Sequence, residues 1–166
     1  MPGPDDGLGK KAEERIKEWL DHPESGYSFD RFYDQMTGFY LTSRNICDFV
    51  CYKYPYQYFI ESKATWKDRF DFSMISETQF AGLLKKSQID GCFGLIIVLF
   101  ASYKRAFILD ICGINDIIVN EGKKSLNIKR LASWPINYVE IPTISSRKAL
   151  LEYSGDFQKL VSQLNQ

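Results

Sequence analysis

The sequence lacks the side chains that build the common zinc and disulfide sites. It contains a single histidine, His22, and no two cysteines in the close spacing of a zinc ligand pair. Three of its four cysteines lie in apolar, strand-like stretches: Cys47, Cys51, Cys92 and Cys112 are the four. We therefore expect free thiols in a reducing compartment and no structural zinc.

Long apolar segments are also missing. The longest, residues 95–101, is too short to cross a bilayer and has the composition of a buried strand. The first residues contain no apolar stretch of the kind found in signal peptides. Walker, GxSxG and GxGxxG motifs are absent as well, which argues against the common nucleotide-binding enzymes and serine hydrolases. We expect no membrane partner.

Neither sign of charge is in excess, because 21 Lys and Arg side chains balance 21 Asp and Glu side chains. A uniformly basic surface for nucleic acid is therefore excluded. The basic residues nevertheless occur in pairs, such as Lys85/Lys86 and Lys123/Lys124. A divalent metal could neutralise a cluster of the acids, so a nucleic-acid ligand stays open on charge alone.

The pattern of apolar residues predicts one α/β domain with a mixed β-sheet flanked by helices. Residues 1–8 are expected to form a flexible tail, and residues 9–166 a single domain of ordinary size. The predicted elements are a helix at 9–20, strands at 39–41, 46–52 and 57–64, a helix that begins after Ser76, strands at 91–101, 106–111 and 137–141, and a final helix from about Ser146.

Charged side chains inside the two strands around residue 54 need an explanation, because unpaired buried charges are costly. With a period of two, Glu61 and Lys63 share one face of their strand. An antiparallel hairpin that turns at Tyr54–Pro55 places Asp48 opposite Glu61 on that same face. The pattern predicts an acid pair with a lysine beside it.

Opposed carboxylates destabilise a sheet by up to about 1 kcal/mol, so a cation is expected between Asp48 and Glu61. Mg²⁺ is commonly held by one or two carboxylates together with water and phosphate, which fits this pair. The alternative is a solvent-facing hairpin on which Glu61 and Lys63 form a simple ion pair. From spacing alone that alternative is favoured, because an Asp followed by Glu-x-Lys is a common pattern.

The same residues resemble a known family. The segment from Cys47 to Phe100 is similar to the core of RecU-type Holliday junction resolvases, which belong to the PD-(D/E)xK nucleases, and more distantly to the archaeal Hjc resolvases. The likeness includes the Ile-Glu-Ser-Lys strand at 60–63 and the helix that carries Gln79. It extends upstream to the first helix with Glu13 and downstream to the Gly-Lys-Lys-Ser-Leu segment at 122–126.

This resemblance implies a restriction-endonuclease-like core and an endonuclease dependent on Mg²⁺ or Mn²⁺. Such an enzyme cuts four-way DNA junctions by paired nicks, leaves 5′-phosphates, works as a homodimer and acts in the cytoplasm of a bacterial or phage-infected cell. Asp48, Glu61, the carbonyl of Ser62 and Glu13 would hold the metal, Lys63 would position the attacking water, Gln79 would join the active site, and Lys67, Arg69, Lys85 and Lys86 would contact DNA phosphates.

Other interpretations remain open at this stage. Glu13 could pair with Lys17 on the rim of its helix, and Gln79 could act only as the capping partner of Ser76. At the level of the whole chain, one alternative is a restriction- or repair-type nuclease that acts on linear duplex. A second is a DNA-binding module on the same fold that does not cleave.

Overall fold

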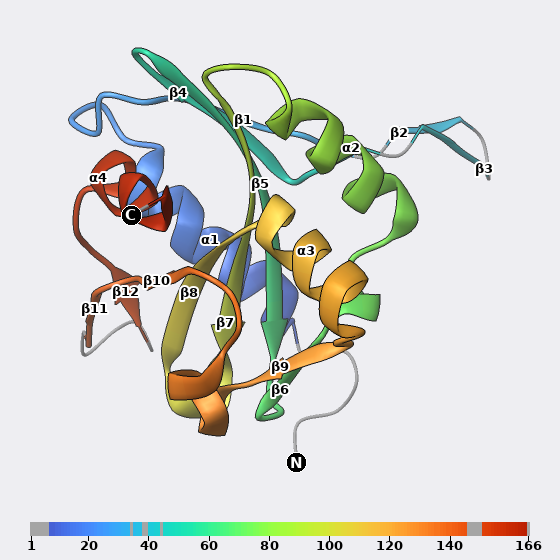
Figure 1. Cartoon of the computed structure of the whole chain (residues 1–166). Helices are drawn as coiled ribbons and strands as arrows, with labels where there is room; N and C mark the ends of the chain where they lie inside the picture. The colour runs from blue at the N-terminus through green and yellow to red at the C-terminus, as the bar shows by residue number, and fades with distance from the viewer. Residues whose placement is uncertain (1–6, 34, 38–39, 44, 146–150, 166) are drawn as a thin grey trace.

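The computed structural model describes residues 7–33, 35–37, 40–43, 45–145 and 151–165. A six-stranded sheet forms its centre (Figure 1). In spatial order its strands are β1 (Ser28–Arg31), β4 (Phe49–Lys53), β5 (Tyr56–Thr65), β7 (Cys92–Phe100), β8 (Arg105–Asp110) and β10 (Tyr138–Glu140). Strands β5 and β7 run parallel and the other neighbours antiparallel, so the sheet is mixed, as predicted.

Helices cover both faces of this sheet. On one face, α1 (Leu8–Leu20) and α4 (Phe157–Ser162) pack on side chains such as Phe49 and Ile60. On the other, α2 (Glu77–Ser87) and α3 (Ile111–Glu121) pack on the alternate residues, such as Phe59. Figure 1 shows α2 and α3 together on one side of the sheet and α1 behind it. The predicted architecture, a mixed sheet flanked by helices, is confirmed.

Helix α2 packs unusually close to the sheet, and glycine makes this possible. A Cβ atom on Gly94 of β7 would lie only 2.6 Å from the carbonyl oxygen of Leu83. A larger residue would therefore push α2 away from the strands below it. Gly94 in this way helps to set the height of α2, and with it the position of Gln79 in the first turn of the helix.

Short antiparallel pairs extend from the main sheet. They are β2 (Gln35–Thr37) with β3 (Tyr40–Ser43), β6 (Arg69–Asp71) with β9 (Ser125–Asn127), and β11 (Thr143–Ile144) with β12 (Glu152–Tyr153). Four 3-10 helices complete the part of the chain that the structure describes: η1 (Phe72–Met74), η2 (Ala101–Tyr103), η3 (Ile128–Ser133) and η4 (Gln163–Asn165). Within the described residues, no helix combines the length and apolar character needed to cross a bilayer.

The largest differences from the sequence prediction are α3 and the start of the final helix. Helix α3 was not predicted, because its Ile- and Val-rich composition resembles a strand; Asp110 starts it by accepting a hydrogen bond from the Cys112 N–H at 2.7 Å. The final helix was predicted from Ser146, which lies outside the described residues. Over residues 152–156 that prediction is wrong, since Tyr153 lies in β12. Gly155, at a φ of 89°, and the helix cap Asp156 start the helix only at Phe157.

Candidate active site

The hairpin β4–β5 has the predicted register. Phe49 pairs with Ile60 and Val50 with Phe59, as the turn at residues 54–55 requires. Asp48 lies one residue beyond the last pair, and its backbone N–H donates to the Ile60 carbonyl at 3.1 Å. The aspartate therefore lies beside Glu61 at the point where β4 leaves β5, just outside the regular ladder.

Beyond this point β5 has a free edge. In the described part of the chain, residues 61–65 pair with β7 on one side and with no strand on the other. The Ser62 N–H donates instead to Asp48 Oδ2 at 2.9 Å. A strand residue directs its N–H and its C=O toward the same edge. The Ser62 carbonyl therefore also points toward the edge where Asp48 lies, as its predicted role requires.

Glu61 and Lys63 project from the face that α2 covers. Among the described residues, Glu61 is the one charged side chain that is buried, with 3% of its surface exposed. Lys63 Nζ lies 3.1 Å from Glu61 Oε2, and Gln79 Nε2 donates to the same oxygen at 2.8 Å. The acid and the lysine thus form a desolvated pair rather than a solvent-facing one, contrary to the alternative left open above.

Gln79 makes the contacts that each of its two predicted roles requires. Its backbone N–H donates to the Ser76 hydroxyl oxygen at 3.2 Å, and its Oε1 accepts the Ser76 N–H at 3.0 Å, which completes a capping box at the start of α2. The same Oε1 accepts a hydrogen bond from Lys63 Nζ at 3.2 Å. The cap therefore fixes the Gln79 side chain in an orientation that holds both Lys63 and Glu61.

Glu13 reaches this group of residues from the opposite side of the sheet. Arg31, at the end of β1, joins it to Asp48: its Nη1 lies 2.8 Å from Glu13 Oε2 and 3.8 Å from Asp48 Oδ1. The guanidinium also lies 5.1 Å from the ring centroids of Tyr33 and Phe49. Glu13 thus pairs with Arg31, and the alternative that it pairs with Lys17 is wrong.

Arg31 is the site residue that sequence reasoning missed. It belongs to a four-residue strand in a stretch for which the sequence predicts no element, so its proximity to Asp48 follows only from the pairing of β1 with β4. A weak signal exists, because Phe29 and Arg31 alternate with exposed residues as strand positions do. That alternation indicates a strand but not its neighbour.

The electrostatic environment raises the pKa of both glutamates. Burial is the main cause for Glu61, the negative charge of Asp48 adds to it, and Lys63 acts in the opposite direction; the pKa rises to about 8. Burial also raises the pKa of Glu13, a rise that its hydrogen bond to Arg31 reduces. Burial and the charge of Asp48 thus favour the protonated form of the Glu61 carboxyl when no cation is bound.

The donor set at this edge fits a divalent cation. Both partners of Glu61 bind Oε2, while Oε1 is buried and accepts no hydrogen bond. Such an oxygen is satisfied either by a proton or by a cation. Within the described residues no three His, Cys, Asp or Glu side chains are arranged to surround a metal, and Arg31 lies between Glu13 and Asp48. The fit accordingly rests on Asp48, Glu61 and the Ser62 carbonyl.

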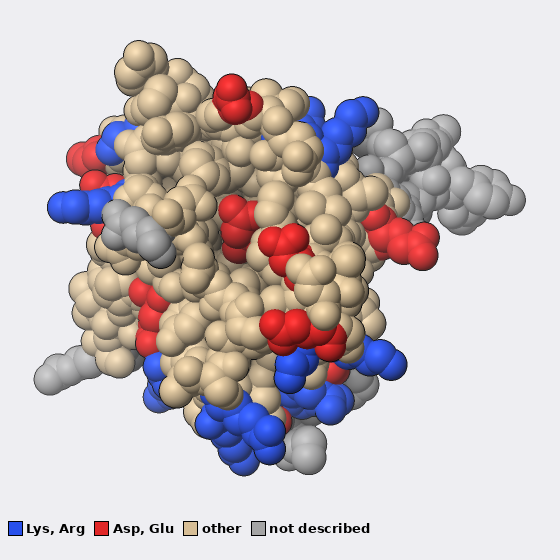
Figure 2. All heavy atoms as spheres, in the orientation of Figure 1, with Lys and Arg blue, Asp and Glu red and all other residues tan. Residues whose placement is uncertain are grey.

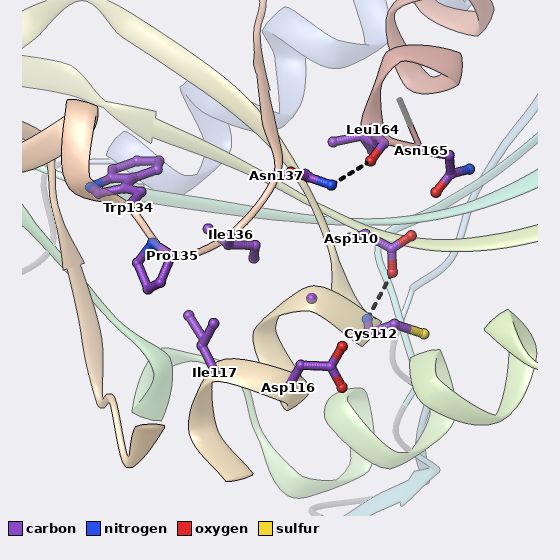
Figure 3. A pocket seen from close by; sticks show the side chains of 11 residues that line it. Asp110, Cys112, Asp116, Ile117, Trp134, Pro135, Ile136, Asn137, Leu164 and Asn165 are labelled. Atoms are coloured by element: carbon purple, nitrogen blue, oxygen red, sulfur yellow. Dashed lines mark hydrogen bonds between the residues drawn. The ribbon is translucent and has the colours of Figure 1, made fainter. Parts of the chain in front are cut away.

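A cavity of about 470 Å³ elsewhere in the molecule contains none of the predicted site residues (Figure 3). Asp110 faces it but accepts the N–H of Cys112, and the Asn137 amide donates to the Leu164 carbonyl at 3.1 Å. These polar groups therefore hold α3 and the C-terminal segment in place. The size of this cavity does not indicate where the chemistry occurs.

The four predicted phosphate contacts form two groups. Lys67 and Arg69 follow the end of β5, where Arg69 Nε pairs with Asp71 at 2.8 Å. Lys85 and Lys86 lie in the last turn of α2, with Lys86 Nζ 5.2 Å from the ring centroid of Phe59. Phe59 shares its face with Glu61, so Lys86 lies on the same side of the sheet as the acids. Their contact with DNA stays a prediction.

Comparisons with protein families and with solved structures each found a match. The family model described as "RecU: Recombination protein U" matches residues 25–153, well over half of the chain. That range includes Asp48, Glu61, Lys63 and Gln79 but begins after α1, so the case for Glu13 rests on its contact with Arg31. No curated protein matches the chain.

Among solved structures, the chain is similar to Hjc of Archaeoglobus fulgidus, described as a Holliday junction resolvase from an archaeal hyperthermophile. The two share 14% sequence identity with a TM-score of 0.50 over 73% of this chain and 89% of that one. At this identity the likeness concerns the fold. It agrees with the nuclease-like core expected from the sequence.

Proposed function

The chain belongs to the RecU family, and from this premise we propose that it is an endonuclease that resolves Holliday junctions with a divalent metal, Mg²⁺ or Mn²⁺. One observation carries the metal part of the proposal. The buried oxygen Oε1 of Glu61 accepts no hydrogen bond and lies in a site that also contains the carboxylate of Asp48. A cation there would satisfy both acids and lower the pKa of Glu61.

In this proposal Asp48, Glu61 and the Ser62 carbonyl hold the metal, with Glu13 as a further ligand. When bound, the metal lowers the pKa of a water molecule and neutralises charge on the scissile phosphate. The Ser62 N–H keeps the Asp48 carboxylate oriented toward the free edge of β5. Release of Arg31 from Glu13 and Asp48 would leave its guanidinium free for a phosphate oxygen.

Lys63 supplies the remaining charge. Its ammonium group is held by Glu61 Oε2 and Gln79 Oε1, so it does not rotate freely into solvent. Held in this way, it positions the attacking water for in-line attack or donates a hydrogen bond to the phosphate. The products would carry a 5′-phosphate and a 3′-hydroxyl, as the family resemblance implies.

Resolution of a four-way junction needs two symmetric nicks, so we propose a two-fold homodimer with one site in each subunit. The segment from Tyr27 to Tyr40 is rich in aromatic residues and is our candidate for the dimer surface; it lies partly outside the described residues. We expect the protein to act where the DNA is, in the cytoplasm of a bacterial or phage-infected cell.

Cleavage of a synthetic four-way junction tests the proposal. With Mg²⁺ we expect paired nicks at symmetric positions on opposite strands, and with EDTA no cleavage, because the acids then lack the cation that supplies the chemistry. A linear duplex that contains the sequence of one arm is the matched substrate. Denaturing gels with each strand labelled in turn give the positions of the nicks.

The possible results separate the alternatives. Cleavage of the linear duplex at the same rate as the junction would indicate a restriction- or repair-type nuclease. Binding of the junction without cleavage, whichever divalent metal is added, would indicate a DNA-binding module. Single nicks that never pair within one binding event would contradict the homodimer.

Gln79 and Ser76 can be separated by mutation. Both Ser76→Ala and Gln79→Ala remove the capping box and should each lower the free energy of unfolding by about 1 kcal/mol. Only Gln79→Ala removes the contacts to Lys63 and Glu61, so it should also slow cleavage by roughly 10–100-fold. Thermal melts and single-turnover cleavage over a range of Mg²⁺ concentrations measure both effects. If the two variants cleave at the same rate, Gln79 acts only as the capping partner of Ser76.

A further inference from the structure

A second concentration of positive charge lies at the pair of short strands β6 and β9. Figure 2 shows Lys and Arg side chains gathered over the lower end of the molecule, where Figure 1 draws these strands. A cavity of about 320 Å³ opens there, and its basic lining residues are Arg69, Lys123, Lys124 and Arg130. The other described lining residues are polar or apolar, without a carboxylate. We call this cavity the basic pocket.

The backbone around the basic pocket is held at several points. Gly122 ends α3 with a φ of 63°, and the Lys123 N–H donates to the Ile117 carbonyl at 3.3 Å. The Lys124 carbonyl accepts the Phe72 N–H at 2.9 Å. Ser125 then enters β9. The backbone that carries the two lysines is therefore fixed by hydrogen bonds. Because it is already ordered, less conformational entropy is lost when the lysines bind a ligand.

Most of the positive charge of the basic pocket is not neutralised by the protein. Asp71 pairs with Arg69 at 2.8 Å, and Asp68 pairs with Lys129, which lies outside the lining, at 3.3 Å. Over the described residues, Lys123, Lys124 and Arg130 form no ion pair. Three unpaired cations around one concave surface match an anionic ligand, and the fixed spacing suits a phosphate better than a flexible acidic peptide.

The position of the basic pocket relates it to the active site. Strand β5 carries Glu61 and Lys63, and it ends at Thr65, about 13 Å beyond Glu61. Strand β6 begins at Arg69, which lines the pocket. Successive phosphates of one DNA strand advance about 3.4 Å along the helix axis. A duplex arm that lies along β5 would advance about four base pairs between Glu61 and Thr65, and the basic pocket follows at the next strand.

We propose that the basic pocket is a second anchor for the DNA backbone, which binds phosphate of the junction arm beyond the cut. The proposal rests on the function proposed above and adds to it a surface that fixes the direction of the arm. Lys123 and Lys124 would contact the phosphate directly, and Arg130 would close the other side. A competing explanation is that the lysines only stabilise the C-terminus of α3 through its dipole. That explanation predicts a loss of stability and no change in DNA binding.

The test uses the double variant Lys123→Gln/Lys124→Gln of the full chain. Affinity for a labelled four-way junction is measured by fluorescence anisotropy in EDTA between about 50 and 300 mM NaCl. We expect the affinity to fall about tenfold or more at the middle of this range, with the slope of log K against log salt reduced by between about one and two. The single-turnover cleavage rate at saturating enzyme and Mg²⁺ should stay within about threefold of wild type, because Lys63 and the acids are untouched.

The matched control is Lys17→Gln/Lys159→Gln, which removes the same charge from exposed positions on α1 and α4. It should bind the junction as the wild type does. The proposal is wrong if the two double variants lose the same affinity for the junction, or if Lys123→Gln/Lys124→Gln leaves the slope of log K against log salt unchanged. Should Lys123→Gln/Lys124→Gln fail to fold, Arg130→Gln makes the same test from the other side of the cavity. A wild type that binds no DNA would overturn the proposed function and the basic pocket together.

Discussion

Replacement of Asp48 by asparagine should reduce cleavage of a four-way junction about a thousandfold or more while junction binding is retained. The amide keeps an oxygen that can accept the Ser62 N–H, so the backbone around it should stay in place. The negative charge that would hold the metal beside Glu61 is lost. A loss of roughly 4 kcal/mol of transition-state stabilisation corresponds to this factor in rate. Single-turnover cleavage and anisotropy binding on the same preparations measure both quantities.

Asp30→Asn is the control for this variant. Asp30 lies on the neighbouring strand β1, is exposed, and pairs with Val50 rather than with an acid. The same chemical change should leave its cleavage rate close to that of the wild type. If Asp48→Asn cuts as fast as Asp30→Asn, Asp48 is not a metal ligand and the assignment of the site fails.

The part of the site that could be predicted from the sequence is the part fixed by local geometry. A period of two places Glu61 and Lys63 on one face, and a short turn determines the register of the hairpin that brings Asp48 to them. These relations involve residues close along the chain. They hold without knowledge of the remaining topology.

The other part depends on contacts between distant segments. Glu13 and Arg31 meet Asp48 only because α1 packs across the sheet and β1 pairs with the outer edge of β4. Periodicity within either element does not show which element lies next to it. The capping-box sequence correctly predicted the start of α2 at Ser76. It could not show that the Gln79 side chain would also reach Lys63.

The burial of Glu61 has the same origin and could not be predicted from its strand alone. Lys63 was equally compatible with an exposed ion pair until α2 was placed over both side chains. Close packing at Gly94 brings the helix to this height. The raised pKa of Glu61 is therefore a property of the tertiary structure, and it has a measurable consequence for stability.

We expect Glu61→Gln to abolish cleavage and, without metal, to make the protein more stable at high pH. The folded-state pKa of Glu61, about 8, is above the usual value of 4.5. A group whose pKa is raised by folding stabilises the folded state fully at pH values below its pKa in the unfolded state. That contribution is lost as the pH rises through its pKa in the folded state. Glutamine stays neutral throughout. The free energy of unfolding of the variant, relative to that of the wild type, should therefore increase between about pH 5 and 8 by a few kcal/mol and then level off.

Thermal melts in EDTA from about pH 5 to pH 9 measure this difference, which corresponds to roughly 5–10 °C in Tm for a chain of this size. Glu152→Gln, an exposed position on β12, shows what the same chemical change does away from the site. Added Mg²⁺ should stabilise the wild type at pH 8 and have much less effect on Glu61→Gln, because ligand binding stabilises only the state that binds it. If the difference in Tm between Glu61→Gln and the wild type does not change with pH, the pKa of Glu61 is not raised in the folded state. If the difference changes with pH but Mg²⁺ stabilises both proteins equally, Glu61 is a buried acid but not a metal ligand.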